Sequence, residues 1–161
     1  LRHFLREAGY EVVMTRDKDV DLASGDGNFK QSDMSARKKI IEDAAPDLVV
    51  SVHQNYYPLR SVRGAQVFYA EGSEVSSDYA NRMQNVLNAS LGCDRVAKGA
   101  DYYILECSEH PSVLVECGFM SNAEEESKLV TPEYQRKIAY AIYSGITGVL
   151  ALGPAFVGID G

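Results

Sequence analysis

The sequence lacks several features that would point to other classes of protein. It has no tryptophan, only 3 cysteines among 161 residues, and no apolar run near the roughly 18 residues that a membrane-spanning helix needs. Cys93, Cys107 and Cys117 include no C-x-x-C pair, which excludes zinc-knuckle spacing. We therefore expect free thiols, buried or half-buried. A nucleophilic Cys117 beside Glu116 is the alternative, although no histidine adjoins it in the sequence.

An excess of basic residues is also missing. The chain carries 16 lysine and arginine residues against 23 aspartate and glutamate residues, and this net charge of -7 argues against binding to a nucleic-acid backbone. Residues 1–13 have neither the apolar core nor the cleavage site of a signal peptide. Because the chain opens inside a helical pattern, we expect any export signal to lie upstream of Leu1.

The apolar pattern predicts strands alternating with helices. Helical spacing, with Gly9 as a C-terminal stop and Thr131 as an N-cap, predicts helices at residues 1–10, 32–45, 73–92 and 131–152. Apolar runs rich in β-branched residues predict strands at 10–17, 47–53, 64–70, 100–105 and 112–119. The acidic segment 123–128 is expected to be a solvated helix start. The sequence thus predicts a single α/β domain with a largely parallel, mixed sheet and helices on both faces.

Three polar residues come at the carboxyl ends of predicted core strands, where α/β sheets bind their ligands. His53 and Asn55 end the run "DLVVSVHQN", and Glu116 lies within "VLVECGF". His53 fits a metal ligand, a base or a polar residue at a sheet edge. Burial of Glu116 is unfavourable unless it is functional or paired, and Arg16 or Arg37 could be its ion-pair partner. An imidazole that binds zinc and a carboxylate that accepts a proton from water would together make a hydrolase.

Five ordered blocks carry a resemblance to a known family. "VLVECGFMSNAEEESKLVTPEYQRKIAYAIYSGI" resembles the C-terminal block of the zinc-dependent N-acetylmuramoyl-L-alanine amidases, and "DLVVSVHQN" is similar to their "DLFISIHAN"-type block. "GYEVVMTRDKD", "SARKKIIEDAAPDLVVSVHQN" and "RGAQVFYA" also resemble that family in order and approximate spacing, with the spore-cortex amidases as the nearest likeness. The resemblance covers residues 1–150 as an amidase-like catalytic domain and leaves residues 151–161 as a C-terminal tail.

This resemblance implies a reaction and a site. The family hydrolyses the amide between N-acetylmuramic acid and the L-alanine of the peptidoglycan stem peptide, so peptidoglycan is the expected partner and the cell wall or exterior the expected location. By the same resemblance His53 is a zinc ligand, Asn55 is a substrate-binding residue beside it, and Glu116 is the catalytic glutamate. The implied Zn²⁺ would polarise the scissile carbonyl, while Glu116 acts first as general base and then as general acid.

The sequence also departs from the family. Family members begin with a strand ending in a "DPGHGG"-like turn, followed by a glutamate, and these complete a two-His, one-Glu zinc site; neither segment is present in this sequence. Two interpretations follow. The chain represents part of an active amidase, or it is a catalytically inactive domain that has lost its metal site and binds peptidoglycan or regulates another protein.

Three other segments bear on this departure. Glu106 and His110 are possible substitute ligands, against the simpler interpretation that both are loop residues. The tail "PAFVGIDG" is apolar and strand-like. We hypothesise that it fills the gap that a missing strand would leave in a parallel sheet, either in its own molecule or in a neighbour.

Overall fold

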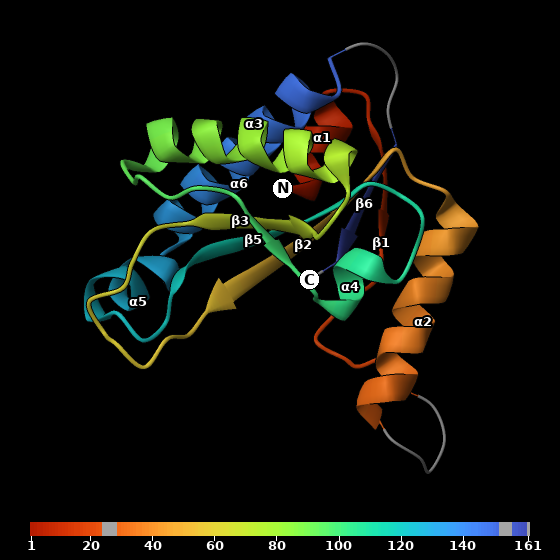
Figure 1. Cartoon of the computed structure of the whole chain (residues 1–161), viewed down its shortest axis with the longest axis horizontal. Helices are drawn as coiled ribbons and strands as arrows, with labels where there is room; N and C mark the ends of the chain where they lie inside the picture. Colours follow the sequence, from red (N-terminus) through yellow and green to blue (C-terminus); the bar gives the residue numbers. More distant parts are fainter. Residues whose placement is uncertain (24–28, 152–155, 161) are drawn as a thin grey trace.

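A six-stranded sheet lies at the centre of the part of the chain that the structure describes. The structure is a computed structural model and describes the backbone of residues 1–23, 29–151 and 156–160, with side chains for the first two ranges. The strand order is β1-β6-β2-β5-β3-β4 (Figure 1). β1, β6, β2 and β5 are mutually parallel, whereas β3 runs antiparallel to β5 and parallel to β4. The strands are β1 (Glu11–Met14), β2 (Leu48–Asn55), β3 (Gln66–Ala70), β4 (Lys98–Ala100), β5 (Ser112–Phe119) and β6 (Phe156–Asp160). The predicted largely parallel, mixed sheet is confirmed.

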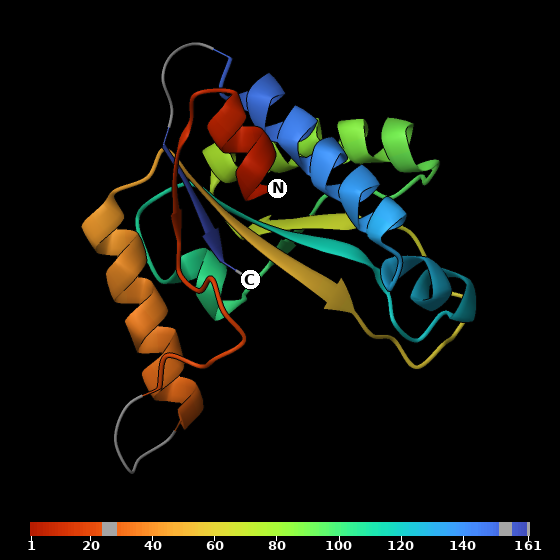
Figure 2. The same cartoon turned by 180° about the vertical axis from the view of Figure 1, so that it is seen from behind.

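Helices cover both faces of this sheet (Figures 1 and 2). On one face α1 (Arg2–Glu7), α3 (Glu74–Leu91) and α6 (Pro132–Val149) pack their apolar side chains against β2 and β5 to form the main core. On the other face α2 (Phe29–Ala44) and α4 (Tyr103–Glu106) form a smaller core, which leaves part of this face open. α5 (Ala123–Leu129) follows β5. None of the described helices is both long and apolar enough to cross a membrane.

Capping residues fix the ends of the two long helices on the first face. Ser73 Oγ accepts a hydrogen bond from the backbone N–H of Ser76 at 3.3 Å where α3 begins, and Gly92 ends α3 in the left-handed conformation, with φ 70°. Thr131 Oγ1 accepts from the N–H of Tyr134 at 3.3 Å where α6 begins. These side chains satisfy backbone groups that a helix leaves without partners at its ends. The predicted helices at 73–92 and 131–152 are confirmed; the second ends at Val149, and Leu152 lies outside the described residues.

Two predicted elements are wrong in part. α2 begins at Phe29, before the predicted start at Ser32. The strand predicted at 100–105 contains only the last residue of β4 and then the short helix α4. Ile104 and Leu105 are both buried in the smaller core. Adjacent residues of a strand point to opposite faces, so only a helical turn lets both pack into the same core.

β6 lies between β1 and β2 rather than at an edge. Val157 is aligned with Val12 on one side and with Leu48 on the other, so β6 pairs in parallel with both neighbours. Within the described residues β1 has no other strand partner. The strand-like tail therefore pairs within its own molecule at residues 156–160, whereas Pro154, Ala155 and Gly161 lie outside the described residues. That the tail replaces a missing strand stays a hypothesis.

Candidate active site

His53 and Glu116 stand side by side at the carboxyl end of the central strands. β2 and β5 are in register with His53 opposite Glu116. Val52 and Val115, one residue earlier in each strand, pack into the main core, so alternation directs His53 and Glu116 to the open face. Both line a cavity of about 530 Å³, a volume typical of ligand sites. The expected convergence of these two residues is thus present in the structure.

Glu116 is a carboxylate held in a poorly solvated place. The residue is 9% exposed, and its Oε2 atom is buried without a hydrogen-bond partner among the described residues. Burial raises the pKa of Glu116 to about 7, so both protonation states are accessible near neutral pH. The described ion pairs include none from Glu116 to Arg16 or Arg37. The alternative of a structural ion pair is therefore wrong for these partners.

A β-bulge follows the His53–Glu116 pair and separates it from Asn55. The register shifts so that Asn55 lies opposite Phe119, and the extra residues include Gly118, whose φ of 154° favours glycine. Asn55 Oδ1 accepts a hydrogen bond from the N–H of Tyr56 at 2.8 Å, and the Asn55 carbonyl accepts from Met120 N–H at 2.8 Å. Asn55 therefore anchors the turn after β2, and its side chain does not line the 530 Å³ cavity.

Glu125 links the segment before β3 to the end of β5. Its carboxylate accepts hydrogen bonds from the backbone N–H groups of Gly64 and Phe119, each at 2.8 Å. Asn122 caps α5 and donates to the carbonyl of Arg60 at 2.9 Å. The predicted helix start at 123–128 is confirmed, but its description as solvated is wrong for Glu125, which is 8% exposed. Its two backbone donors explain the burial, because a carboxylate loses less free energy on burial when it is hydrogen-bonded.

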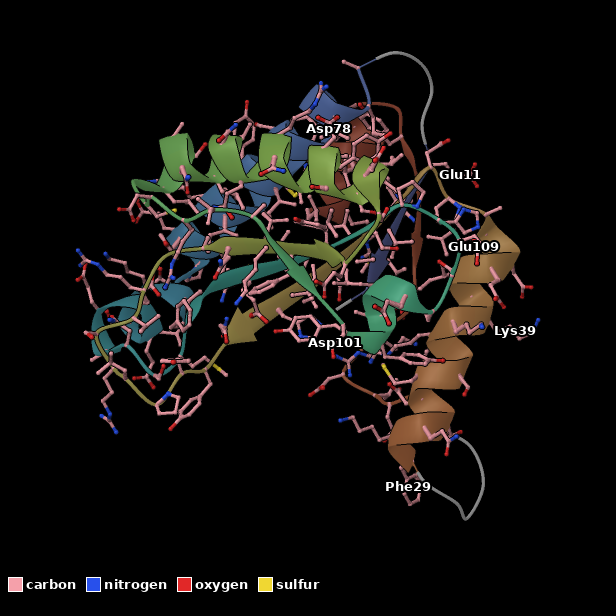
Figure 3. The ribbon with its side chains drawn as sticks, viewed as in Figure 1. Glu11, Phe29, Lys39, Asp78, Asp101 and Glu109 are labelled. Atoms are coloured by element: carbon pink, nitrogen blue, oxygen red, sulfur yellow. The ribbon has the colours of Figure 1, made fainter. Side chains whose placement is uncertain are left out.

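The remaining cavity wall comes from residues that the sequence did not bring together. Arg16 after β1 and Arg37 on α2 line one part, and the segment 101–104 lines another. Figure 3 shows Asp101 beside the start of α4. Burial raises the pKa of Tyr102, and the negative charges of Glu116 and Asp101 add to this, so its hydroxyl lies near both carboxylates. A signal for the arginines existed, since both lie in blocks that resemble the amidases, but nothing local places them at one cavity.

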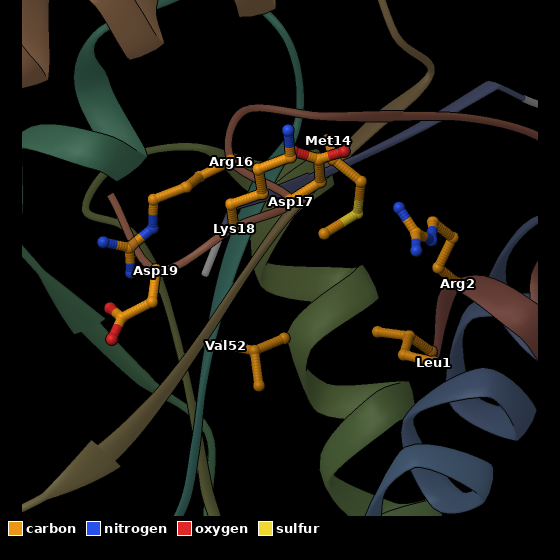
Figure 4. A pocket seen from close by; sticks show the side chains of 8 residues that line it. All are labelled: Leu1, Arg2, Met14, Arg16, Asp17, Lys18, Asp19 and Val52. Carbon is orange, nitrogen blue, oxygen red and sulfur yellow. The ribbon is translucent and has the colours of Figure 1, made fainter. Parts of the chain in front are cut away.

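A second cavity of about 570 Å³ adjoins the first beside β1 (Figure 4). Arg16 lines both cavities. In Figure 4 its side chain extends away from Leu1 and Val52 and toward Asp19. Arg16 therefore stands at the boundary between the site and the space next to the outer strand.

The other candidate residues lie outside this arrangement. The three cysteines are thiols outside any disulfide, as predicted, and Cys117 packs into the main core, on the opposite face from Glu116. Burial, with the charge of Glu116, raises the pKa of Cys117 to about 12, which excludes a thiolate nucleophile there. Glu106 is exposed and His110 half-buried, and neither lines the site cavity. His53 is exposed at the cavity, and the described residues contain no cluster of three metal-ligating side chains.

Comparison with known proteins gives consistent matches. The family model for N-acetylmuramoyl-L-alanine amidase matches residues 1–148. The germination-specific N-acetylmuramoyl-L-alanine amidase of Bacillus subtilis is 36% identical over 152 residues, which cover 91% of this chain and 64% of the relative. The N-acetylmuramoyl-L-alanine amidase LytC of the same organism is 37% identical over 105 residues, 63% of this chain and 21% of the relative. The chain thus spans less than two thirds of the length of either relative.

Solved structures of amidases also match this chain. The CwlD amidase of Clostridioides difficile, solved in complex with the GerS lipoprotein, superposes with a TM-score of 0.89 and 32% identity over 94% of this chain and 81% of that chain. The catalytic domain of CwlV, an N-acetylmuramoyl-L-alanine amidase from Bacillus (Paenibacillus) polymyxa var. colistinus, gives a TM-score of 0.81 with 27% identity, over 94% of this chain and 79% of that chain.

Proposed function

The chain belongs to the N-acetylmuramoyl-L-alanine amidase family, and from this membership we propose that it hydrolyses the amide bond between N-acetylmuramic acid and L-alanine in peptidoglycan. One observation supports this more than any other. Glu116 presents a buried carboxylate oxygen, which has no hydrogen-bond partner in the part of the chain that the structure describes, beside His53 at a cavity large enough for a ligand. A carboxylate in such a place is unfavourable for folding, which is the pattern expected of a catalytic group.

In the proposed reaction Glu116 transfers protons. As the carboxylate, it takes a proton from a water molecule while that water attacks the carbonyl carbon of the scissile amide. Glu116 then gives the proton to the nitrogen of L-alanine as the C–N bond breaks, which leaves a lactyl carboxylate and a free amine. A pKa of about 7 suits both steps, because a base and acid that works near neutral pH needs both forms within reach.

Zinc is the proposed cofactor, with His53 as one ligand. When bound in such enzymes, zinc polarises the carbonyl and makes water more acidic. Catalytic zinc sites usually have three protein ligands, and the described residues offer no group of three His, Cys, Asp or Glu side chains. The described residues therefore supply only part of a zinc ligand set. The proposed proton transfers of Glu116 do not depend on the position of the metal.

Asn55 is proposed to contribute to substrate binding from the rim of the site. Its Oδ1 atom is held by Tyr56 N–H, which orients the side-chain amide and leaves its N–H groups as donors for a substrate carbonyl. We further propose that residues 1–150 form the catalytic region, with residues 151–161 as the tail that supplies β6. As a cell-wall hydrolase with autolysin activity, the protein would act outside the cell or in the wall.

An assay of peptidoglycan digestion tests the proposal. Purified peptidoglycan is incubated with the chain at increasing zinc concentration, and newly formed L-alanine amino groups are labelled and counted. We expect amino groups to appear in proportion to bound zinc, without new reducing ends from glycan cleavage. The alternative, a domain that binds the wall without cleaving it, draws on the incomplete ligand set of the described residues. Sedimentation with peptidoglycan without any amine release at saturating zinc would support that alternative.

A further inference from the structure

Two guanidinium groups line the candidate active site together with His53 and Glu116. The Arg37 side chain is only 9% exposed, and its Nε donates to Asp33 Oδ2 at 2.7 Å. Asp33 in turn accepts a hydrogen bond from the backbone N–H of Leu22 at 2.7 Å. These contacts hold the Arg37 guanidinium in one orientation at the cavity wall, so it is preorganised for a ligand.

Arg16 lies close enough to the Asp33 carboxylate for its charge to act on it. The pKa of Asp33 is lowered first by the hydrogen bond from Leu22, and then by Arg37 and by the charge of Arg16. Glu116 behaves differently, since burial alone accounts for its raised pKa and neither arginine opposes the shift. The arginines therefore form a cationic wall that is separate from the proton-transferring carboxyl.

The chemistry of this wall suits a carboxylate ligand. A guanidinium has five N–H donors in a planar fork, and it binds carboxylates in a bidentate way. The other groups that line the cavity are aromatic, apolar or themselves acidic, namely Met34, Asp101, Tyr102, Tyr103, Ile104 and Leu114. An anionic part of a substrate therefore has one favourable place in this cavity, beside Arg16 and Arg37.

From this arrangement we infer that Arg16 and Arg37 bind a carboxylate of the stem peptide, next to the L-alanine whose amide is cleaved. The inference rests on the proposed function and makes it more specific. A stem peptide whose second residue is D-glutamate carries such a carboxylate, whereas one with D-isoglutamine carries a neutral amide of nearly the same shape. The site thus distinguishes peptidoglycan with free carboxylates from amidated peptidoglycan.

A pair of ligands tests this inference without requiring turnover. N-acetylmuramoyl-L-alanyl-D-glutamate and N-acetylmuramoyl-L-alanyl-D-isoglutamine are titrated separately into the folded chain by calorimetry. We expect the glutamate form to bind about tenfold more tightly, the size typical of a hydrogen bond to a charged group. Arg16→Gln should reduce this preference to near unity. Arg37→Lys, which keeps a charge beside Asp33 but loses the fork, should reduce it in part.

Arg63→Gln is the matched control, because Arg63 is 67% exposed in its side chain, pairs with Glu124 and does not line the cavity. It should keep the full preference. Equal binding of the two ligands by the unmodified chain, or a preference that survives Arg16→Gln, overturns the inference and leaves the proposed function intact. Failure of both ligands to bind overturns the inference and counts against the proposed substrate as well. Circular dichroism of each variant confirms that it is folded.

Discussion

The central pair of strands, β2 and β5, and the outer pair, β1 and β6, belong to one parallel array but are held in different ways. Every residue of β5 is buried, and the central pair supplies side chains to both cores. In β1 only Val12 is buried, and β1 is joined to the rest of the sheet through β6. The proposed chemistry lies on the central pair, where packing on both faces restricts motion. The outer pair instead positions one cavity wall, because Arg16 lies two residues after the end of β1.

The largest expected effect is on the central pair. Glu116→Gln keeps the shape of the side chain but removes its ability to accept a proton, so we expect hydrolysis to fall by roughly 10²- to 10⁴-fold. Release of L-alanine amino groups from peptidoglycan measures this loss. Glu124→Gln is the matched control, since Glu124 is exposed and lies outside the cavity, and it should retain full activity. Undiminished turnover in Glu116→Gln would reject the role of Glu116 as the base.

The second prediction separates the two pairs. Gly158 lies within β6, which is paired on both sides, and proline there removes a backbone donor from an interior strand. We expect Gly158→Pro to destabilise the fold by about 2–3 kcal/mol. Hydrogen exchange should show that the amides of Val12 and Val13 lose protection while those of Val113 and Val115 keep it.

Gly158→Ala is the control for this substitution, because alanine keeps the backbone donor. It should leave the exchange of the β1 amides protected. If the β1 amides are as protected in Gly158→Pro as in the unmodified chain, β6 does not hold β1 in the sheet. The proposed difference between the central and outer pairs is then wrong.

A third prediction concerns how the free energy of unfolding depends on pH through Glu116, which lies on the central pair. The pKa of Glu116 is about 7 in the folded chain against an ordinary value of 4.5, so between these values the folded state binds more protons than the unfolded state. The contribution of Glu116 is therefore most favourable below pH 4.5 and is lost as the pH rises through 7. We expect a loss of roughly 2 kcal/mol, after allowance for screening by solvent in the open cavity.

The comparison of the unmodified chain with Glu116→Gln isolates this effect. Asp33 has a lowered pKa, so its own contribution is lost in the opposite direction, as the pH falls. Urea unfolding of both chains, freed of metal with a chelator, at pH 4.5 and pH 8 measures the difference. An equal pH dependence in the two chains would contradict the burial of an ionisable Glu116.

The smallest effect is expected on the outer pair. Arg6 Nη2 donates to the carbonyl of Val12 at 3.1 Å and so links α1 to β1. Arg6→Ala should destabilise the chain by about 1 kcal/mol, the size of one partly buried hydrogen bond. Arg2→Ala, in the same helix, is the control and should have a smaller effect. Thermal unfolding ranks the two variants, and equal stability would show that the link between α1 and β1 contributes nothing.

Much of the fold could be predicted from local signals. Ser73, Gly92 and Thr131 mark helix ends through capping chemistry that acts within a few residues. The conflict between a carboxylate and the apolar run around Glu116 also indicated a functional residue before its surroundings were known. The resemblance to the amidases joined His53 to Glu116 as one site.

Other features depend on contacts between distant parts of the chain. β5 is apolar on both faces, so no alternation in its sequence fixes which residue stands opposite His53. The helix α4 forms because Ile104 and Leu105 both enter one core, against the strand preference of their segment. Arg37 reaches the cavity through the packing of α2 on the sheet, which the charged run "ARKK" does not indicate.

The interior position of β6 also has a consequence for how the chain acquires its fold. Glu11 pairs with Phe156, so nearly the whole described chain separates the two partners. Contacts between such distant residues form late, because the intervening chain must first be brought together. Among the described strands β1 pairs only with β6, so this pairing forms only after α6 and β6 have been made. We therefore expect the insertion of β6 to be a late step of folding, and in pulsed hydrogen exchange the amides of β1 should gain protection after those of the β2–β5 pair.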